Sequence, residues 1–190
     1  MEYTFYALLG LALAASCGFR VFVPMLVVSI ASYSGYVELA PNFAWLGSLP
    51  ALIIFAIASV LEIVAYYVPW LDNILDTVAT PAAIVAGILV SASFITDMNP
   101  LLKWILAVVA GGGAAGFVQT ATVGARTLAT ATTARVGNPI VSTLENIASL
   151  VISVLSVVLP VVGIILALAV IAFLIYFMSK MKRSFARAKS

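Results

Sequence analysis

Four charged residues lie inside segments that are otherwise apolar enough for a lipid bilayer: Arg20, Glu62, Arg126 and Glu145. One charged side chain at the centre of a membrane helix costs about 2.5–3.5 kcal/mol on insertion scales. Four would cost on the order of 10 kcal/mol if they were neither paired nor hydrated. We therefore expect these side chains to face one another or water, and to mark the functional centre of the chain.

This set of residues is compatible with two kinds of chemistry. The arginines could bind an anionic or polar solute, while the glutamates balance them or take up protons when the solute leaves. Proton uptake is reasonable because a carboxyl group in a medium of low dielectric constant is protonated more readily than in water. Alternatively, the four residues form structural ion pairs that pin helices together, and the sequence leaves both interpretations open.

Catalysis, metal binding and nucleic-acid binding have little support. The chain has no histidine and one cysteine, Cys17, so an internal disulfide is impossible. No cluster has metal-ligand spacing. An intramembrane enzyme built on Glu62 and Glu145 would need two facing carboxylates, for which nothing else in the sequence argues. We expect no enzyme, no cofactor and no nucleic-acid partner.

The composition defines the class of protein. Of 190 residues, 64% are hydrophobic and only 8% are charged, whereas charged residues make up about a quarter of a typical soluble domain. The mean hydropathy is +1.22. Continuous apolar segments indicate helices rather than the alternating pattern of a membrane β-barrel. We predict an all-α polytopic membrane protein with about six transmembrane helices in a single domain over 1–190.

Prolines and glycines divide this domain into segments. Prolines that follow a capping residue predict helix starts at Pro50, Pro81, Pro100 and Pro139. Two segments contain Gly-x-Arg, at 18–20 and 124–126, and we expect both helices to be broken there, near the middle of the membrane. The apolar segments are 4–33, 50–68, 80–96, 100–122, 139–155 and 163–178.

A short internal match predicts two inverted halves. Residues 59–65 resemble residues 142–148, and each segment contains Leu-Glu. Each half would contain three spans, about 1–98 and 99–179, and an odd number of spans inverts the second half, as in many transporters. Lysine and arginine crowd the tail at 180–190, which indicates a cytoplasmic C-terminus. With six spans the N-terminus is then cytoplasmic too.

Three further features have a structural and a functional interpretation. Trp70, Asp72 and Asp76 could gather a cation at a pore mouth, or could belong to a short interfacial helix anchored by Tyr66 and Tyr67. Gly111–Gly113 and Gly116 predict close helix packing, within one subunit or at a dimer seam. Gln119 is either a pathway residue or an interhelical hydrogen-bond donor, and threonines between 120 and 133 give that helix a hydroxyl-rich lining.

Four motifs together resemble a known family: 18–24 (GFRVFVP), 61–73 (LEIVAYYVPWLDN), 110–119 (AGGGAAGFVQ) and 137–145 (GNPIVSTLE). They resemble the bacterial membrane family catalogued as domain of unknown function 4126. The resemblance implies an integral protein of the bacterial inner membrane and names no substrate. It also implies that the motif residues belong to one site or framework, namely Arg20, Glu62, Pro69, Trp70, Asp72, Asn138 and Glu145.

We therefore expect a small transporter or channel-like protein for a small anionic or polar solute, and its glutamates are compatible with coupling to protons. Its solute would contact Arg20, Arg126, Glu62, Glu145, Gln119 and Asn138. One subunit of this size encloses little volume, so we expect a homodimer surrounded by membrane lipids. The alternative is a scaffold, assembly or lipid-binding protein whose ion pairs are structural. A third interpretation, a lipid-headgroup flippase, predicts a lateral opening beside the arginines.

Overall fold

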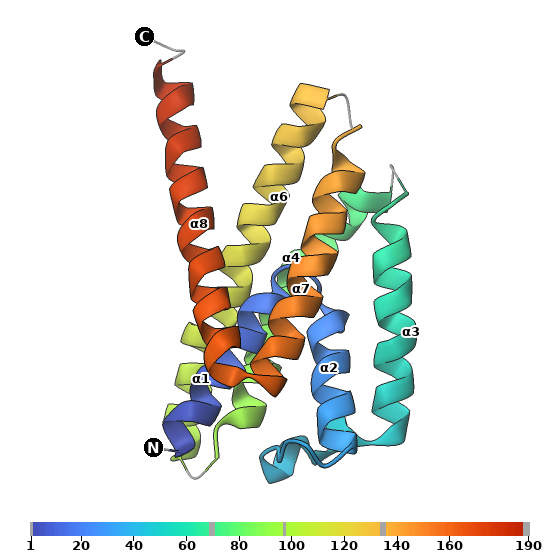
Figure 1. The fold of residues 1–190 in the computed structure, drawn as a ribbon, viewed down its shortest axis with the longest axis vertical. Coiled ribbons are helices and arrows are strands. Elements are labelled where there is room, and N and C mark those ends of the chain that lie inside the picture. Colours follow the sequence, from blue (N-terminus) through green and yellow to red (C-terminus); the bar gives the residue numbers. More distant parts are fainter. Residues whose placement is uncertain (1, 69–70, 97, 134–135, 188–190) are drawn as a thin grey trace.

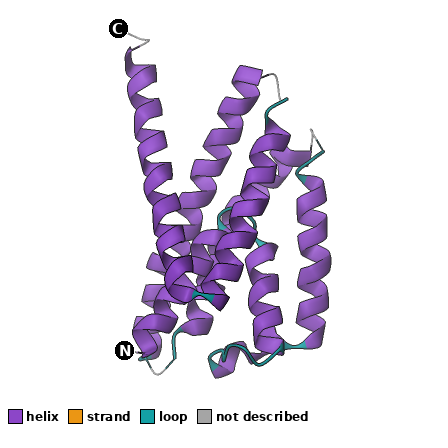
Figure 2. Cartoon of the chain, in the orientation of Figure 1, coloured by secondary structure: helices purple, strands orange, loops and turns teal. Residues whose placement is uncertain are grey.

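The described chain is built of helices, in keeping with the predicted class. The computed structural model describes residues 2–68, 71–96, 98–133 and 136–187, and within this part Figure 2 shows helices and loops but no strands. The helices stand roughly along one long axis, with the start of the first and the end of the last at opposite ends of the molecule (Figure 1).

The first apolar segment forms a helical hairpin that turns back inside the protein. α1 (Glu2–Cys17) and α2 (Phe22–Tyr33) are separated by residues 18–21. Gly10 of α1 packs against Ser91 of α4, and the Ala40 N–H, just beyond α2, donates to the Ser93 carbonyl at 2.8 Å. Both ends of the hairpin therefore lie at the same end of α4, and the tip lies deep in the molecule (Figure 1).

The next elements lead across the molecule and back. η1 (Pro41–Gly47) is a short 3-10 helix bent by 60° from α3 (Leu49–Ala65). α4 (Leu71–Phe94) contains Pro81 in its interior, so the predicted helix start at Pro81 is wrong. Membrane helices tolerate an internal proline because neighbouring groups can satisfy the backbone carbonyl that it leaves free.

The fourth segment is one long helical rod. α5 (Pro100–Leu106), the π-helical stretch η2 (Ala107–Gly112) and α6 (Gly113–Thr133) follow one another without a loop. The predicted break at Gly124-Ala125-Arg126 is therefore wrong. Gly124 lies within α6, and glycine interrupts a membrane helix weakly because no water competes for the backbone hydrogen bonds.

Three glycines of this rod, Gly111, Gly112 and Gly116, pack within the subunit. A Cβ added to Gly111 would lie 2.5 Å from the Ser91 Cβ and 2.7 Å from the Gly87 carbonyl oxygen of α4. Gly112 and Gly116 face Ile88 and Ile84 on the same helix. α4 therefore covers these three glycines, which agrees with the interpretation that the motif serves close helix packing within one subunit.

α7 (Asn138–Val158) and α8 (Pro160–Arg187) complete the fold. They meet at a tight turn, where Gly163 lies against the backbone of Ser156. α8 includes much of the basic tail and ends far from the start of α1 (Figure 1). If the long axis follows the membrane normal, the two ends of the described chain face opposite sides. The prediction of two cytoplasmic termini assumed a full crossing by the first segment, and the sides on which the termini lie stay a prediction.

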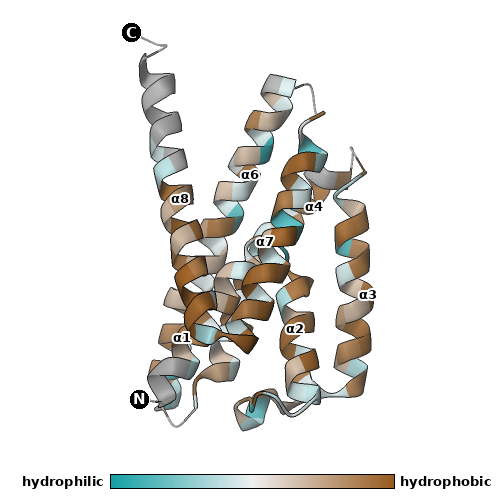
Figure 3. Cartoon of the chain, in the orientation of Figure 1, coloured by the Kyte–Doolittle hydropathy of each residue, from teal (hydrophilic) through white to brown (hydrophobic). Residues whose placement is uncertain are grey.

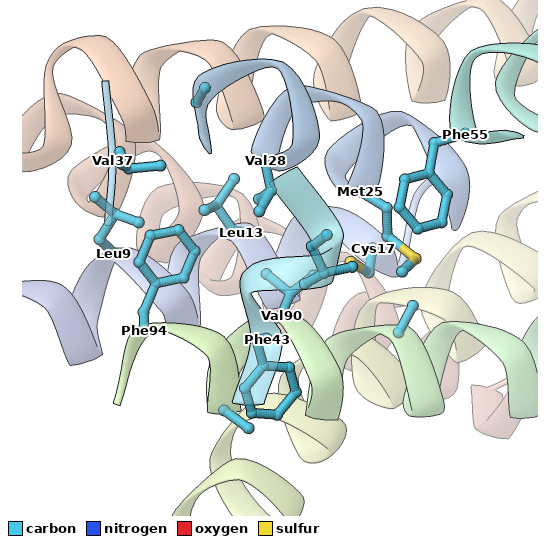
Figure 4. Packing of buried hydrophobic residues seen from close by; sticks show 14 of the residues in the cluster. Leu9, Leu13, Cys17, Met25, Val28, Val37, Phe43, Phe55, Val90 and Phe94 are labelled. Carbon is cyan, nitrogen blue, oxygen red and sulfur yellow. The ribbon is translucent and has the colours of Figure 1, made fainter. Parts of the chain in front are cut away.

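Apolar side chains fill the interior and cover much of the exterior. One core joins α1, α2, η1 and α4, and Figure 4 shows Leu13, Val28, Phe43, Val90 and Phe94 within it. A second core joins α1, α6, α7 and α8. Large apolar side chains are also exposed along the outer helices, and Figure 3 colours most of the α3 ribbon and the first half of the α8 ribbon brown. This exterior suits lipid rather than water.

Length and composition allow three of the described helices to cross a bilayer: Ile74–Phe94, Pro100–Ala131 and Asn138–Val158. The bent pair of η1 and α3 would make a fourth. Six spans in two inverted halves therefore remain a prediction. The two Leu-Glu motifs do lie on α3 and α7, but Glu62 is near the C-terminal end of α3 whereas Glu145 is a third of the way along α7.

Candidate functional site

The tip of the α1–α2 hairpin brings Arg20 against α7. Gly18 makes this approach possible, because a Cβ at this position would lie 2.5 Å from the Ala115 carbonyl oxygen of α6. Arg20 is 1% exposed. Its Nη1 donates to Glu145 Oε2 at 2.8 Å, its Nε to Asn146 Oδ1 at 2.5 Å and its Nη2 to the Ser142 carbonyl at 3.1 Å.

Arg126 of α6 reaches the same carboxylate from the other side. Its Nε donates to Glu145 Oε1 at 3.1 Å and its Nη2 to Glu145 Oε2 at 2.5 Å. Its Nη1 pairs with Asp76 Oδ1 of α4. Glu145 therefore bridges two buried arginines. The predicted proximity of Arg20, Arg126 and Glu145 agrees with this geometry, whereas Asp76 joins the cluster rather than standing apart at an interface.

Tyr66 packs against both guanidinium groups. The Cζ atoms of Arg20 and Arg126 are 4.1 and 4.2 Å from its ring centroid, within range of a cation–π interaction with each arginine. The ring is 3% exposed. The prediction that Tyr66 anchors the protein at the membrane surface is therefore wrong, because the residue is at the centre of the charged cluster.

Glu62 performs a different task from Glu145. Its Oε1 accepts from the Val21 N–H at 2.7 Å and its Oε2 from the Phe22 N–H at 3.0 Å. These amides open α2, where the helix dipole favours a negative charge. No described arginine or lysine lies within salt-bridge distance of Glu62. The carboxylate thus caps the second half of the hairpin and holds its tip in place.

The charged cluster lies off centre along the helices. At 1.5 Å per residue, Glu145 is about 10 Å from the start of α7 and about 20 Å from its end. Arg126 is also about 10 Å from the end of α6, and Glu62 about 20 Å from the start of α3. In a hydrocarbon core about 30 Å thick, the cluster is nearer the end of the molecule that carries the end of α8. The depth of the site in the membrane stays a prediction.

The remaining predicted site residues border the cluster or lie outside it. Gln119 is 1% exposed beside the hairpin tip, and its Nε2 has no partner in the described part of the chain. Asn138 is buried and exchanges hydrogen bonds with Thr130 at 3.0 and 3.1 Å. Trp70 and the side chain of Asp72 lie outside the described residues.

The threonines of α6 do not form a common lining. Thr120, Thr127 and Thr133 are exposed, and each donates to a carbonyl four residues earlier on its own helix. Thr122 is buried but likewise bonds its own helix, at the Gln119 carbonyl. These hydroxyls are therefore satisfied locally, as threonines in membrane helices commonly are.

Sequence reasoning missed a polar stripe along α7. Polar residues recur there at intervals of three or four, which places them on one helix face. All are buried, and Ser149 and Ser153 contact Ser16 of α1. The recurrence of polar residues at this spacing within an apolar helix could have revealed the stripe. It would also have shown that Glu145 belongs to a longer polar face of α7. The stripe comprises Asn138, Ser142, Glu145, Ser149, Ser153 and Ser156.

Two cavities flank the cluster. One, of about 330 Å³, lies among α2, α3 and α4 and is bordered by Glu62 and Tyr66. The other, of about 180 Å³, lies among α6, α7 and α8 and is bordered by Glu145 and Thr122. Their walls are otherwise apolar. In the described part of the chain no group of three or more His, Cys, Asp or Glu could hold a metal.

The fold and the site define a class of helical membrane protein with a buried, arginine-rich ion cluster at the tip of a helical hairpin. The chain belongs to the family "Domain of unknown function (DUF4126)", whose model matches residues 7–180. No curated protein and no solved structure matches the chain.

Proposed function

We propose that the protein is a small transporter or channel-like protein for an anionic or polar solute, seen in a closed arrangement. The observation that carries this proposal is the sharing of one carboxylate, Glu145, by two buried arginines at a hairpin tip. An arginine pair held this way is a preformed anion site, because guanidinium groups match carboxylate and phosphate oxygens. The incoming anion would take the place of Glu145.

Exchange at the arginines suggests a coupling step. When a solute anion occupies Arg20 and Arg126, the displaced Glu145 carboxylate is left in an apolar setting next to Thr122 and Ala148. A carboxylate without a partner is costly there, so proton uptake would accompany binding. Solute release would return Glu145 to the arginines and free the proton.

The route to the cluster is shorter from the C-terminal end. Tyr67 is 42% exposed there, and its hydroxyl bonds Thr143 at 2.9 Å and Asn146 at 3.3 Å, next to Arg20. The basic residues at 180–190 orient that end toward the cytoplasm. We therefore propose cytoplasmic access, a cytoplasmic C-terminus and an N-terminus on the opposite side of the bacterial inner membrane.

Two finer expectations belong with this proposal. Corresponding helices of the two groups α2–α4 and α6–α8 run in opposite directions along the long axis: α2 against α6, α3 against α7 and α4 against α8 (Figure 1). This arrangement supports an inverted pair of halves. A homodimer remains attractive because the cavities of about 330 and 180 Å³ beside the cluster are small. The seam of such a dimer would lie away from Gly111 and Gly116, which α4 already covers.

A structural role for the cluster is the second candidate. Arg20 donates four hydrogen bonds, and Arg20, Arg126 and Glu145 are only 1–3% exposed. Because these charged groups are already paired and buried, they favour a scaffold or lipid-binding protein in which the ion pairs hold the hairpin against α6 and α7. It differs from the transporter in predicting that no solute reaches the arginines.

Flux through proteoliposomes separates the two functions. Purified protein would be reconstituted, and uptake of radiolabelled nitrate, sulfate, phosphate and acetate measured against empty vesicles. The transport proposal predicts uptake of at least one of these anions by the wild type, and loss of that uptake in Arg126→Lys. Lysine keeps the positive charge but cannot donate to two oxygens in the planar geometry of a guanidinium group. Lys103→Gln is the matched control, since Lys103 lies over Phe43, away from the cluster. Folded protein that moves none of these anions would contradict the transport proposal.

A further inference from the structure

The cavity among α2, α3 and α4 has a composition unlike that of the charged cluster beside it. Its volume is about 330 Å³, and its walls are apolar apart from Glu62 and Tyr66. Two wall residues, Leu61 of α3 and Val78 of α4, are 63% and 59% exposed on the outside of the helices. Because that outside is apolar, the cavity opens sideways toward lipid rather than toward water.

Glu62 gives this cavity its charge. The residue is 8% exposed and borders the cavity while its oxygens accept from the Val21 and Phe22 amides. Each carboxylate oxygen has two acceptor positions, so both retain one after these bonds. The ion pairs of the described residues join Arg20, Arg126, Asp76 and Glu145 and leave Glu62 out. Its oxygens are therefore held by backbone amides, and Arg20 and Arg126 act on it through space without a direct ion pair.

A ligand for this space must satisfy both features. Pockets for small organic ligands begin at about 300 Å³ and combine apolar walls with few polar groups. A single carboxylate at the side of an apolar pocket selects a hydrogen-bond-donating cation, and a lateral opening selects a compound that partitions into the bilayer. A simple inorganic cation would leave the apolar walls unused, and an anion would be repelled by Glu62.

We propose that this cavity binds an amphiphile with an ammonium head group, which enters from the bilayer and places its head group on Glu62. The alkyl part lies along Ala58, Ala79 and Ala82, small residues that leave room for it. The site goes beyond the proposed solute transport, since neither arginine borders it, and the failure of one proposal leaves the other standing.

Three probes with the same chain test the head-group preference. Binding of radiolabelled decylamine, decanol and decanoate would be measured on protein in nanodiscs, with empty nanodiscs subtracted for partition into lipid. Decylamine is expected to bind saturably, and at least about tenfold more tightly than decanol, because a hydrogen bond between charged groups is about twice as strong as one between neutral groups. Decanoate is expected not to bind specifically.

Two variants locate the binding. Glu62→Gln retains an oxygen for one backbone amide and should reduce the decylamine preference over decanol to about onefold. Ala58→Phe fills the cavity from its outer wall, leaves Glu62 in place and should weaken decylamine and decanol alike. Lys103→Gln is the control that should bind decylamine as the wild type does, because Lys103 lies over Phe43 and does not border the cavity. Equal decylamine affinity in the wild type and Glu62→Gln, or an equal affinity of the wild type for decanol, would overturn the proposal.

The ammonium amphiphile could be a membrane lipid or a free amine. Mass spectrometry of lipids carried through purification distinguishes these sources. Phosphatidylethanolamine retained by the wild type and reduced in Glu62→Gln and Ala58→Phe identifies a lipid, whereas decylamine binding without such enrichment identifies a free amine. Enrichment of anionic lipid that depends on Glu62 would contradict the assigned charge preference.

Discussion

Replacing Glu145 with glutamine should destabilise the protein more than any other single change of a carboxylate. Glu145 accepts three hydrogen bonds from Arg20 and Arg126, at 2.8, 3.1 and 2.5 Å. Glutamine has nearly the same shape but removes the negative charge, so that Arg126 keeps only Asp76 and Arg20 loses the one carboxylate that pairs with it among the described residues. Removing one partner of a buried ion pair costs about 3–5 kcal/mol. We expect Glu145→Gln to lower the free energy of unfolding by about that amount.

Glu62→Gln is the matched control for this prediction. Glu62 accepts hydrogen bonds from two backbone N–H groups and from no described arginine. The glutamine side chain would lose about one of these hydrogen bonds, which should lower the free energy of unfolding by about 1 kcal/mol. Unfolding by SDS in mixed micelles, followed by circular dichroism, compares the two variants under one condition. Equal destabilisation by both substitutions, or a loss below about 1 kcal/mol for Glu145→Gln, would refute the bridging role of Glu145.

Three further substitutions test the packing around the cluster. Gly18→Ala should lower thermal stability sharply in differential scanning fluorimetry, because its Cβ would meet the Ala115 carbonyl oxygen at 2.5 Å; an unchanged melting temperature would show that the hairpin tip does not rest on α6. Gly111→Ala should also be destabilising, while Gly113→Ala, whose Cβ meets nothing within 4 Å, should melt at or above the wild-type temperature. Tyr66→Leu should cost about 1–4 kcal/mol in SDS unfolding through loss of two cation–π contacts; a neutral effect would remove Tyr66 from the cluster's energetics.

Much of the cluster was predictable because charge in an apolar chain is costly. That argument alone led to Arg20, Arg126 and Glu145, which the structure brings together. It could not separate Glu145 from Glu62, since both follow leucine in matching local segments. Their difference depends on what each helix faces: α7 faces two arginines, while α3 faces the amides that open α2.

Local signals also misled where tertiary contacts decide. Gly-x-Arg occurs twice. The first motif lies at 18–20, where the chain is not helical, whereas the second, at 124–126, lies inside α6. Pro24 explains part of this difference, because it lies in the first turn of α2, where its missing N–H costs nothing. No proline follows Gly124 before the end of α6. Proline after the Gly-x-Arg was thus the stronger signal.

The hairpin also bears on the number of crossings. Counting apolar segments predicts six crossings and both termini on one side, but hydropathy cannot distinguish a segment that crosses from one that returns. α1 and α2 are each too short to span a 30 Å core, at about 24 and 18 Å. Length after interruption, rather than total apolar length, was the informative quantity.

Access of water-soluble reagents to the arginine cluster tests the central claim most directly. Ser142→Cys would be made in a Cys17→Ala background, since the Ser142 carbonyl accepts from Arg20 and the side chain is fully buried. Leu144→Cys, 62% exposed on the lipid side of α7, is the control expected to stay unreactive. A transporter predicts modification of Ser142→Cys by a membrane-impermeant thiol reagent from the C-terminal side, slowed by the transported anion. Protection of that cysteine from both sides, in folded protein, would contradict transport and leave the cluster as a structural ion pair.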